Sequence, residues 1–437
     1  MDYLVVEGGR PLEGAIKISG AKNSCLKLMA ASLLARGRTV LQNVPRIADV
    51  FTMVEVLEYL GAIVEFESDV MSIDTAGDIG SEAPYELVRR MRASINVLGP
   101  LLARCGHARV ALPGGCNIGS RTIDIHERTL EQLGVTFQFD HGFLEGKAEH
   151  LTGRRIVLDF PSRGATENLL TTASLADGVT VIENAAREPD LVDLAEFLNL
   201  MGADIVGAGT STIVITGAAE LAAAEFRVGS DPIEAGTFAL ATAATQGETE
   251  LLGARPSDLD IFLEKLVNTG CAWRETERGL QVSMSRRPQA TDFVTLPFPG
   301  FPTDLQPPMM AYLACSDGTS IVTENVFESR FLHVQELARM GADIRVDGHH
   351  AVVKGVPRLQ GAPVRVPDLR AGAALLIAAL AAEGQTLLHD IHHLDRGYED
   401  LPEKLKRAGG IIERVNLESG RSYAPSHRRE DSAGSPA

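Results

Sequence analysis

A pattern that recurs about every 70 residues constrains the fold of this chain more than any other feature. In each repeat, a segment rich in small apolar residues ends at a glycine and precedes a β-branched stretch, and these glycines are Gly37, Gly106, Gly178, Gly247, Gly318 and Gly384. A second segment ends at another glycine before a further apolar strand, at Gly61, Gly134, Gly202, Gly270, Gly341 and Gly409. The sequence therefore predicts six supersecondary units.

The two helices of each unit have different patterns of apolar residues. The first is apolar nearly all round, as over residues 373–382, which predicts a buried helix that neighbouring helices approach closely. The second is amphipathic: in the third unit Asp190 is a predicted N-cap, and Leu191, Leu194 and Leu198 form one stripe. Together these patterns predict an α/β protein in which sheets cover the amphipathic helices and the Ala-rich helices lie inside.

Six units divide naturally into two domains of three. We expect a first domain over residues 22–229 and a second over residues 1–21 plus 230–417. The second is discontinuous because residues 5–15 resemble residues 352–362, so the N-terminal strands are expected to pair with the last units. Residues 418–437 are polar and mixed in charge, and we expect a disordered tail there.

The charge balance and the cysteines exclude several functional classes. The 41 Lys and Arg residues against 58 Asp and Glu give a net charge of −17, which argues against nucleic acid and membrane surfaces as partners. The longest apolar stretch, residues 371–382, is about half of a membrane span, and the N-terminus does not resemble a signal peptide. The five scattered cysteines form no C-x-x-C pair, so neither a disulfide framework nor a zinc cluster is indicated. A cytoplasmic globular protein is expected.

One cysteine stands apart from the others. Three glycines and a proline surround Cys116 within residues 112–121, which predicts an exposed loop in which Arg121 could stabilise the thiolate. From the residues alone, a chemical and a structural role for Cys116 are equally open. The other four, Cys25, Cys105, Cys271 and Cys315, are expected to be small buried apolar residues.

Cationic residues recur beside small residues at predicted helix starts. Lys22, Arg92 and Arg370 occupy such positions, and Arg330 and Arg396 lie nearby in later units. Two facing domains would bring these helix N-termini to one cleft, where dipoles and guanidinium groups suit phosphate and carboxylate; the alternative is a set of solvated charges. Asp304, before the Ala-rich helix of the fifth unit, is either an N-cap or a general base.

Seven segments closely resemble the UDP-N-acetylglucosamine 1-carboxyvinyltransferase family: residues 20–23, 91–95, 112–121, 183–189, 301–306, 328–331 and 395–399. These enolpyruvyl transferases act at the first committed step of peptidoglycan synthesis, and the resemblance extends over residues 1–417. It implies two inside-out α/β barrel domains, each of three βαβαββ-type units, with a cleft between them. It implies no metal, no organic cofactor and no obligate protein partner.

By this resemblance, the enolpyruvyl group of phosphoenolpyruvate passes to the 3-hydroxyl of UDP-N-acetylglucosamine, and phosphate leaves a tetrahedral intermediate. Cys116 matches the proton donor, which can also carry a pyruvate adduct, and Asp304 matches the base. The phosphoenolpyruvate site would comprise Lys22, Asn23, Arg121, Arg370 and Arg396. The nucleotide-sugar site would comprise Arg92, Arg121, Thr122, Ile123, Asp124, Ile125, Ser162, Arg163, Gly164, Asp304 and Val326, supported by Glu328, Arg330 and Asp368.

Three departures from the family pattern concern the acceptor. Arg163 is unusual at its position and either supplies a cation to the diphosphate or faces solvent; Lys27 stands where Pro is usual, and Thr122 also replaces a Pro. They keep open an enolpyruvyl transferase with another nucleotide acceptor in specialised metabolism. The enzyme for shikimate 3-phosphate lacks the Cys loop and is disfavoured. A non-catalytic repeat scaffold would need neither a reactive Cys nor convergent cations.

Overall fold

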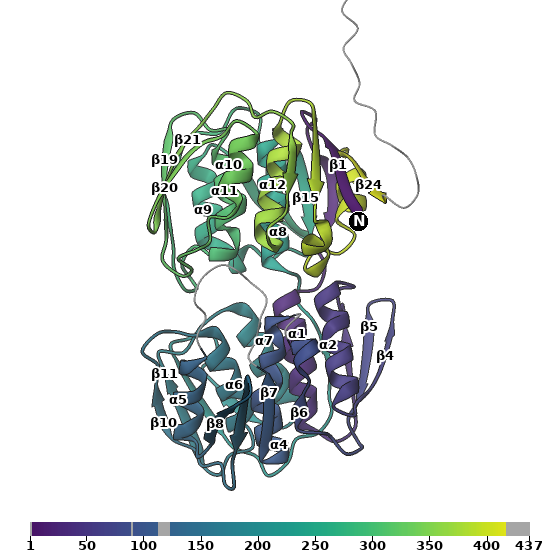
Figure 1. Cartoon of the computed structure of the whole chain (residues 1–437), viewed down its shortest axis with the longest axis vertical. Helices are drawn as coiled ribbons and strands as arrows, with labels where there is room; N and C mark the ends of the chain where they lie inside the picture. The colour runs from purple at the N-terminus through teal and green to yellow at the C-terminus, as the bar shows by residue number, and fades with distance from the viewer. Residues whose placement is uncertain (1, 89–90, 112–122, 417–437) are drawn as a thin grey trace, which may run out of the picture.

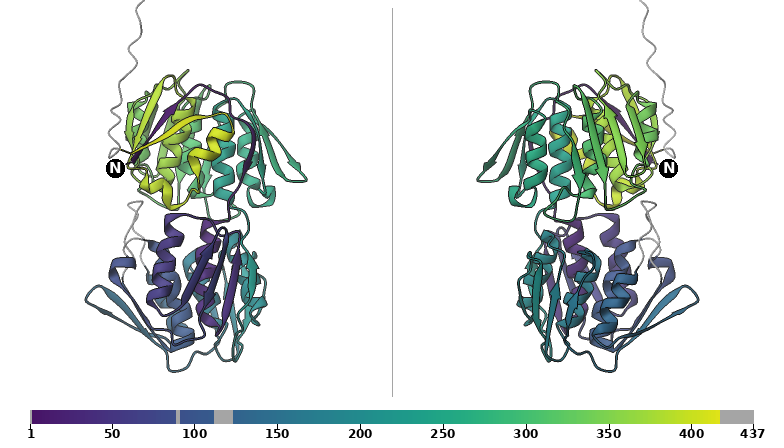
Figure 2. Two further views of the ribbon diagram at one scale, coloured as in Figure 1. Left: turned by 90° about the vertical axis from the view of Figure 1, so that its right-hand side faces the viewer. Right: turned by 90° about the vertical axis from the view of Figure 1, so that its left-hand side faces the viewer.

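The computed structural model describes residues 2–88, 91–111 and 123–416, which form two lobes stacked along the longest axis and joined at a narrow waist (Figures 1 and 2). The loop that carries Cys116, Arg121 and Thr122 lies outside these residues, as does the predicted tail. The two lobes have separate hydrophobic cores. One is built from residues between Ala21 and Val228, and the other from Leu4 to Ile18 together with Ala235 to Ile412.

The lower lobe in Figure 1 holds the first seven α-helices of the described chain. They are α1 (Lys22–Ala31), α2 (Ala48–Tyr59), α3 (Tyr85–Val88), α4 (Leu98–Cys105), α5 (Asp124–Gln132), α6 (Arg163–Ala173) and α7 (Pro189–Leu200). Its strands are β3 (Arg38–Gln42), β4 (Ile63–Glu67), β5 (Val70–Asp74), β6 (Glu82–Ala83), β7 (His107–Ala111), β8 (Thr136–Asp140), β9 (Phe143–Lys147), β10 (Arg155–Val157), β11 (Val179–Glu183), β12 (Asp204–Val206), β13 (Thr212–Thr216) and β14 (Glu225–Arg227).

The upper lobe combines the N-terminal strands with the second half of the chain. Its helices are α8 (Pro232–Ala244), α9 (Asp260–Asn268), α10 (Gln306–Leu313), α11 (His333–Arg339), α12 (Leu369–Ala381) and α13 (Leu401–Arg407). Its strands are β1 (Asp2–Glu7), β2 (Glu13–Lys17), β15 (Glu248–Leu252), β16 (Ala272–Thr276), β17 (Gly279–Ser283), β18 (Phe293–Thr295), β19 (Thr319–Glu324), β20 (Asp343–Asp347), β21 (His350–Lys354), β22 (Pro363–Arg365), β23 (Gln385–His389) and β24 (Ile411–Asn416).

The described strands form six four-stranded sheets, which agrees with the six units expected from the glycine pattern. All six share one pattern: an edge strand pairs in parallel with the second strand, and the remaining two pairings are antiparallel. The order β14-β3-β5-β4 in the first unit is representative. The glycine after each amphipathic helix has a positive φ, between 89° and 108°, a conformation that other residues adopt at a cost.

The N-terminal strand completes the last sheet. β1 lies between β23 and β24, antiparallel to both, with Leu4 opposite Leu388 and Arg414, so the predicted pairing with the last unit is confirmed for this strand. β2 pairs in parallel with β15 of the fourth unit, so it joins the same lobe as β1 but not the last sheet. The chain runs from β2 into the lower lobe and returns at α8, so β2 takes the edge position that β18 holds beside β19.

The Ala-rich helices lie inside their lobes, as their sequence predicts. In the upper lobe α8, α10 and α12 pack against one another, and residues 369–380 of α12 are all buried. Small side chains permit this close contact because they leave little bulk between helix backbones. Two local predictions are wrong: α7 starts at Pro189, so Asp190 is inside the first turn and is no N-cap, and Cys105 is exposed. No helix in the described part of the chain combines the length and apolar character needed to span a membrane.

Candidate functional site

A cleft of about 560 Å³ lies between the lobes and takes residues from both. The lobes connect there through two adjacent segments, which form a β-bridge between Gly20 and Ser230. The expected site residues that line this cleft are Lys22, Asn23, Ile125, Ser162, Arg163, Gly164, Asp304, Val326, Arg330, Asp368, Arg370 and Arg396. These expected residues come from five of the six units, and the fourth unit adds residues such as Ile233, Arg255 and Asp260, so all six units meet at the waist of the molecule.

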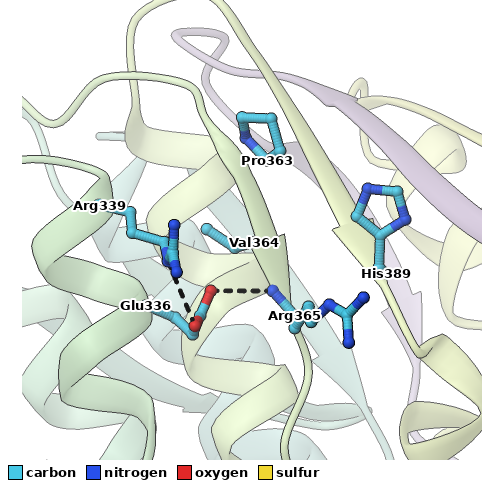
Figure 3. Close-up of a pocket in the computed structure, with 6 residues that line it drawn as sticks. All are labelled: Glu336, Arg339, Pro363, Val364, Arg365 and His389. Atoms are coloured by element: carbon cyan, nitrogen blue, oxygen red, sulfur yellow. Dashed lines mark hydrogen bonds and ion pairs between the residues drawn. The ribbon is translucent and has the colours of Figure 1, made fainter.

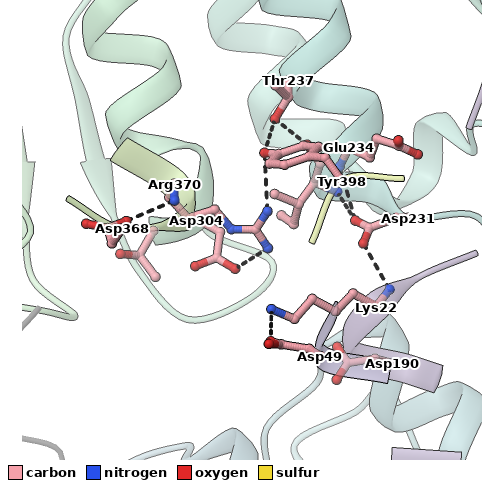
Figure 4. Close-up of polar contacts among 12 residues, drawn as sticks. Lys22, Asp49, Asp190, Asp231, Glu234, Thr237, Asp304, Asp368, Arg370 and Tyr398 are labelled. Carbon is pink, nitrogen blue, oxygen red and sulfur yellow. Dashed lines mark hydrogen bonds and ion pairs between the residues drawn. The ribbon is translucent and has the colours of Figure 1, made fainter. Parts of the chain in front are cut away.

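Helix N-termini from both lobes point to this region, held by aspartates. Asp231 accepts hydrogen bonds from the backbone N–H groups of Ile233 (2.8 Å) and Glu234 (3.1 Å) and so caps α8. Its other oxygen accepts from the backbone N–H of Lys22 at the start of α1 (3.0 Å). Asp368 caps α12 in the same way. Asp231 thereby holds the first turns of a lower and an upper helix in a fixed relation (Figure 4).

Asp304 lies between two buried arginines. Arg330 Nη2 donates to one carboxylate oxygen (2.7 Å) and Arg370 Nη2 to the other (3.1 Å), and both guanidinium side chains are no more than 6% exposed. Burial alone would raise the pKa of this carboxyl, but Arg370 and Arg330 hold it well below its usual range. The N-cap alternative is wrong, because Pro302 and Leu305 occupy the capping positions here.

The two arginines are themselves anchored. Arg370 Nη1 donates to the Tyr398 hydroxyl (3.3 Å), which shares a hydrogen bond with Thr237 Oγ1 (2.9 Å) on α8 (Figure 4). Arg330 Nη1 donates to Thr303 Oγ1 (2.7 Å). Because both guanidinium groups are held by such partners, the cationic wall of the upper lobe is preorganised rather than flexible.

Lys22 and Arg396 share one carboxylate across the waist. Lys22 Nζ lies 2.5 Å from Asp49 Oδ2, and Arg396 Nε donates to Asp49 Oδ1 (2.9 Å). Burial lowers the pKa of Lys22, and Asp49 opposes that shift. Burial alone would raise the pKa of Asp49, but Lys22 and Arg396 hold it below its usual value. Two cations expected to bind phosphoenolpyruvate are therefore brought together by a carboxylate from α2.

Arg163 is paired rather than solvated. Its Nε donates to Asp190 Oδ2 (2.8 Å) and its Nη2 to Asp190 Oδ1 (2.5 Å), a two-pronged contact between the first turns of α6 and α7. Lys27 Nζ lies 2.9 Å from the same carboxylate. The alternative that Arg163 simply faces solvent is wrong, because its guanidinium is bound to Asp190. Part of the side chain also lines the cleft.

Some expected site residues lie elsewhere or outside the described chain. Ile123 is buried, and Asp124 starts α5 and pairs with Arg128; neither lines the cleft. Glu328 is exposed and lies outside the cleft lining. Arg92 starts a 3₁₀ helix, but its side chain is not described, and Cys116, Arg121 and Thr122 lie in residues 112–122. The roles assigned to all these residues stay predictions.

Sequence reasoning missed the carboxylates that hold the cations. The sequence predicts only a helix start at Asp190, and the contacts of Asp49, Asp190 and Asp231 with other units are seen in the structure alone. Each lies in or before a first helical turn, where acidic residues are common because they stabilise the helix dipole. That common signal conceals the second role, since the partner cations come from other units of the sequence.

A second pocket, of about 310 Å³, lies on the upper lobe beside α11 and β22 (Figure 3). Its central carboxylate, Glu336, accepts from the backbone N–H of Arg365 (3.0 Å) and pairs with Arg339 Nε (3.4 Å). The Glu336 carboxylate is therefore satisfied by groups of the pocket itself. Among the described residues, no group of three or more His, Cys, Asp or Glu side chains is arranged to hold a metal ion.

Comparison with known proteins identifies the family. A family model described as EPSP synthase (3-phosphoshikimate 1-carboxyvinyltransferase) matches residues 6–405. The UDP-N-acetylglucosamine 1-carboxyvinyltransferase of Corynebacterium jeikeium is 52% identical over 95% of this chain and 99% of its own length. The enzymes of that name from Mycobacterium tuberculosis (51%; 95% and 99%) and Thermotoga maritima (50%; 96% and 100%) are similarly close. This chain belongs to the UDP-N-acetylglucosamine 1-carboxyvinyltransferase family.

Solved structures agree with this family assignment. The enolpyruvyl transferase NikO from Streptomyces tendae aligns with a TM-score of 0.84 and 27% identity, covering 95% of this chain and 99% of its own. EPSP synthase from Acinetobacter baumannii aligns with a TM-score of 0.73 at 18% identity, covering 95% and 100%, and supports the fold alone. The predicted α/β class and family are confirmed, and the fold is that of the enolpyruvyl transferases.

Proposed function

We propose that this chain transfers the enolpyruvyl group of phosphoenolpyruvate to the 3-hydroxyl of UDP-N-acetylglucosamine, with release of phosphate. The observation that carries the proposal is the meeting of Lys22, Arg396, Arg370 and Arg330 with Asp304 in one cleft. Both substrates are multiply charged anions, and fixed cations stabilise charge without an added cofactor. Relatives that are 50–52% identical over nearly the whole chain bear the name of this reaction.

The same proposal includes the architecture. Each lobe is an inside-out α/β barrel of three units, with domains at residues 22–229 and at residues 1–21 plus 230–417. The separate cores and the three buried helices of the upper lobe support this division. Two like-built domains can close on a substrate by a small rotation about the adjacent segments at Gly20 and Ser230.

Asp304 acts as the base toward the acceptor hydroxyl in this proposal. In the described state two arginines depress its pKa, which makes it a poor base. A phosphate or carboxylate that takes over contacts with Arg370 or Arg330 removes part of that stabilisation, so the pKa of Asp304 rises when substrate is bound. The basicity of Asp304 is thus coupled to occupation of the anion site, which limits proton transfer to the loaded cleft.

Lys22 and Arg396 serve the phosphoenolpyruvate anion, and Cys116 delivers the proton to its methylene carbon. Asp49 holds both cations in the cleft before substrate arrives, which lowers the cost of assembling two positive groups. The product would enter peptidoglycan synthesis, so the host is expected to need this reaction for its cell wall.

A phosphate-release assay tests the proposal. Purified protein is mixed with phosphoenolpyruvate and one acceptor from a panel: UDP-N-acetylglucosamine, other UDP-sugars, free nucleotides and shikimate 3-phosphate. UDP-N-acetylglucosamine should give the highest kcat/KM. A clear preference for another nucleotide would instead favour an enolpyruvyl transferase of specialised metabolism, and no release with any acceptor would refute the transferase proposal.

A further inference from the structure

Three helices of the lower lobe, α1, α6 and α7, meet around one lysine. Lys27, in α1, places Nζ 2.9 Å from Asp190 Oδ2 in α7 and 3.2 Å from Glu167 Oε2 in α6. It also donates to the backbone carbonyl of Asn23 (3.3 Å). The side chains of Lys27, Glu167 and Asp190 are each less than a tenth exposed, so these charges interact in a medium less polar than water.

Arg163 connects this buried group to the cleft. Its Nε and Nη2 bind Asp190, which leaves Nη1 and the second N–H of Nη2 for another partner. The side chain is 35% exposed and lines the cleft, whereas its counter-ion is almost fully buried. Asp190 therefore fixes the orientation of a partly exposed guanidinium that lines the cleft.

The charge that Arg163 offers to an anion depends on its buried neighbours. Burial raises the pKa of Glu167, and the Lys27 ammonium opposes that shift. The other charged groups that face Glu167 are Asp190 from α7 and Arg163 from its own helix. His126 of α5 shares a hydrogen bond (3.0 Å) with Asn168 of α6, the helix that carries Glu167.

We propose that Lys27 is a positioning residue that sets the affinity of Arg163 for the diphosphate of the nucleotide sugar. It does so because its buried ammonium partly neutralises the carboxylates of Glu167 and Asp190. With Lys27 present, its ammonium offsets one of the three carboxylates nearby, Glu167, Asp190 and Glu188, and Arg163 can share its charge with a ligand. Without it, an ionised Glu167 leaves one excess negative charge close to the diphosphate. This inference rests on the proposed function, because it concerns the same substrate.

Lys27→Met removes the ammonium while keeping a side chain of similar length. At low pH Glu167 takes up a proton and the group stays neutral, so the KM for UDP-N-acetylglucosamine should stay near the wild-type value. As pH rises, Glu167 loses that proton. One unit charge at about 8 Å from the doubly charged diphosphate, with an effective dielectric constant near 60, weakens anion binding about tenfold. We therefore expect the variant-to-wild-type KM ratio to rise with pH, from about 1 where Glu167 is protonated to about 10 once it is ionised. The ratios for kcat and for the phosphoenolpyruvate KM should change less than about threefold.

Three further variants separate charge from packing. Lys27→Arg keeps the cation and should give a flat KM ratio. The double variant Lys27→Met/Glu167→Gln removes both charges and should abolish the pH dependence. Glu167→Gln alone, with Lys27 in place, removes one negative charge and should lower the nucleotide-sugar KM several-fold. This last variant tests the same reasoning should Lys27→Met fail to fold.

The failures of the two proposals are distinguishable. Wild-type protein that does not turn over UDP-N-acetylglucosamine would refute the proposed function. Wild-type protein that is active, with a KM ratio for Lys27→Met that is flat with pH or equally raised in the double variant, would refute only the role of Lys27. An unchanged or raised KM in Glu167→Gln would also overturn it, because a purely structural contact lowers no KM when it is broken.

Discussion

Replacing Asp304 by Asn removes one negative charge and one potential base while keeping the shape of the side chain. Loss of a general base typically slows turnover by about 10² to 10⁴, which corresponds to about 2.7–5.5 kcal/mol of transition-state stabilisation. Because Asp304 is the shared partner of Arg330 and Arg370, the change should also affect anion binding. With their counter-ion gone, the two arginines should bind inorganic phosphate up to about tenfold more tightly.

The assay measures enolpyruvyl product by chromatography, with phosphate added as an inhibitor. We expect kcat to fall by at least about a hundredfold and the phosphate inhibition constant to decrease. The matched control is Asp260→Asn, which makes the same charge change at an exposed residue of the cleft and should alter both quantities less than about threefold. If Asp304→Asn retains more than a third of wild-type kcat, Asp304 is not the base. If phosphate binds more weakly, the two arginines need Asp304 for their orientation.

The contribution of Asp304 to the stability of the wild-type protein should depend on pH. The folded-state pKa of Asp304 lies below the ordinary value of 3.8, so the ionised carboxyl stabilises the fold above about pH 4. This contribution is lost as pH falls below that value, because the unfolded chain then binds the proton first. Wild-type protein should therefore lose more free energy of unfolding between pH 5 and pH 3 than Asp304→Asn, as measured by urea denaturation.

Three other substitutions extend the test. Cys116→Ala should reduce turnover by about 10² to 10⁴ while UDP-N-acetylglucosamine still binds in calorimetry, and full turnover would remove Cys116 from the mechanism. Arg163→Ala should raise the nucleotide-sugar KM with little change in kcat, whereas an unchanged KM would exclude contact with the diphosphate. Arg104 donates to the carbonyls of Leu33 (2.8 Å), Ala35 (2.7 Å) and Thr75 (2.8 Å), so Arg104→Met should lower the free energy of unfolding by about 2–4 kcal/mol. Equal urea midpoints for Arg104→Met and wild type would show that water replaces those bonds.

The parts of the fold that depend on local sequence were predictable. The apolar faces of α8, α10 and α12, the glycines that end helices, and the number of units all follow from spacing, because helix and strand periods are properties of the backbone. The position of β2 was not predictable from its likeness to a later segment. Its partner β15 is set by where the chain leaves and re-enters the upper lobe.

The candidate site also has features that the sequence determines and features that only the tertiary structure determines. The sequence by itself determined which cations, and which carboxylate at Asp304, are available, since their motifs are local and specific. Only the tertiary structure decided how they pair: Asp49 binds Lys22 and Arg396, although Asp49 and Arg396 are 347 positions apart, and Asp190 binds both Arg163 and Lys27. An ion pair depends on the distance between two side chains in space, and in this molecule that distance is set by helices from different units meeting at the waist.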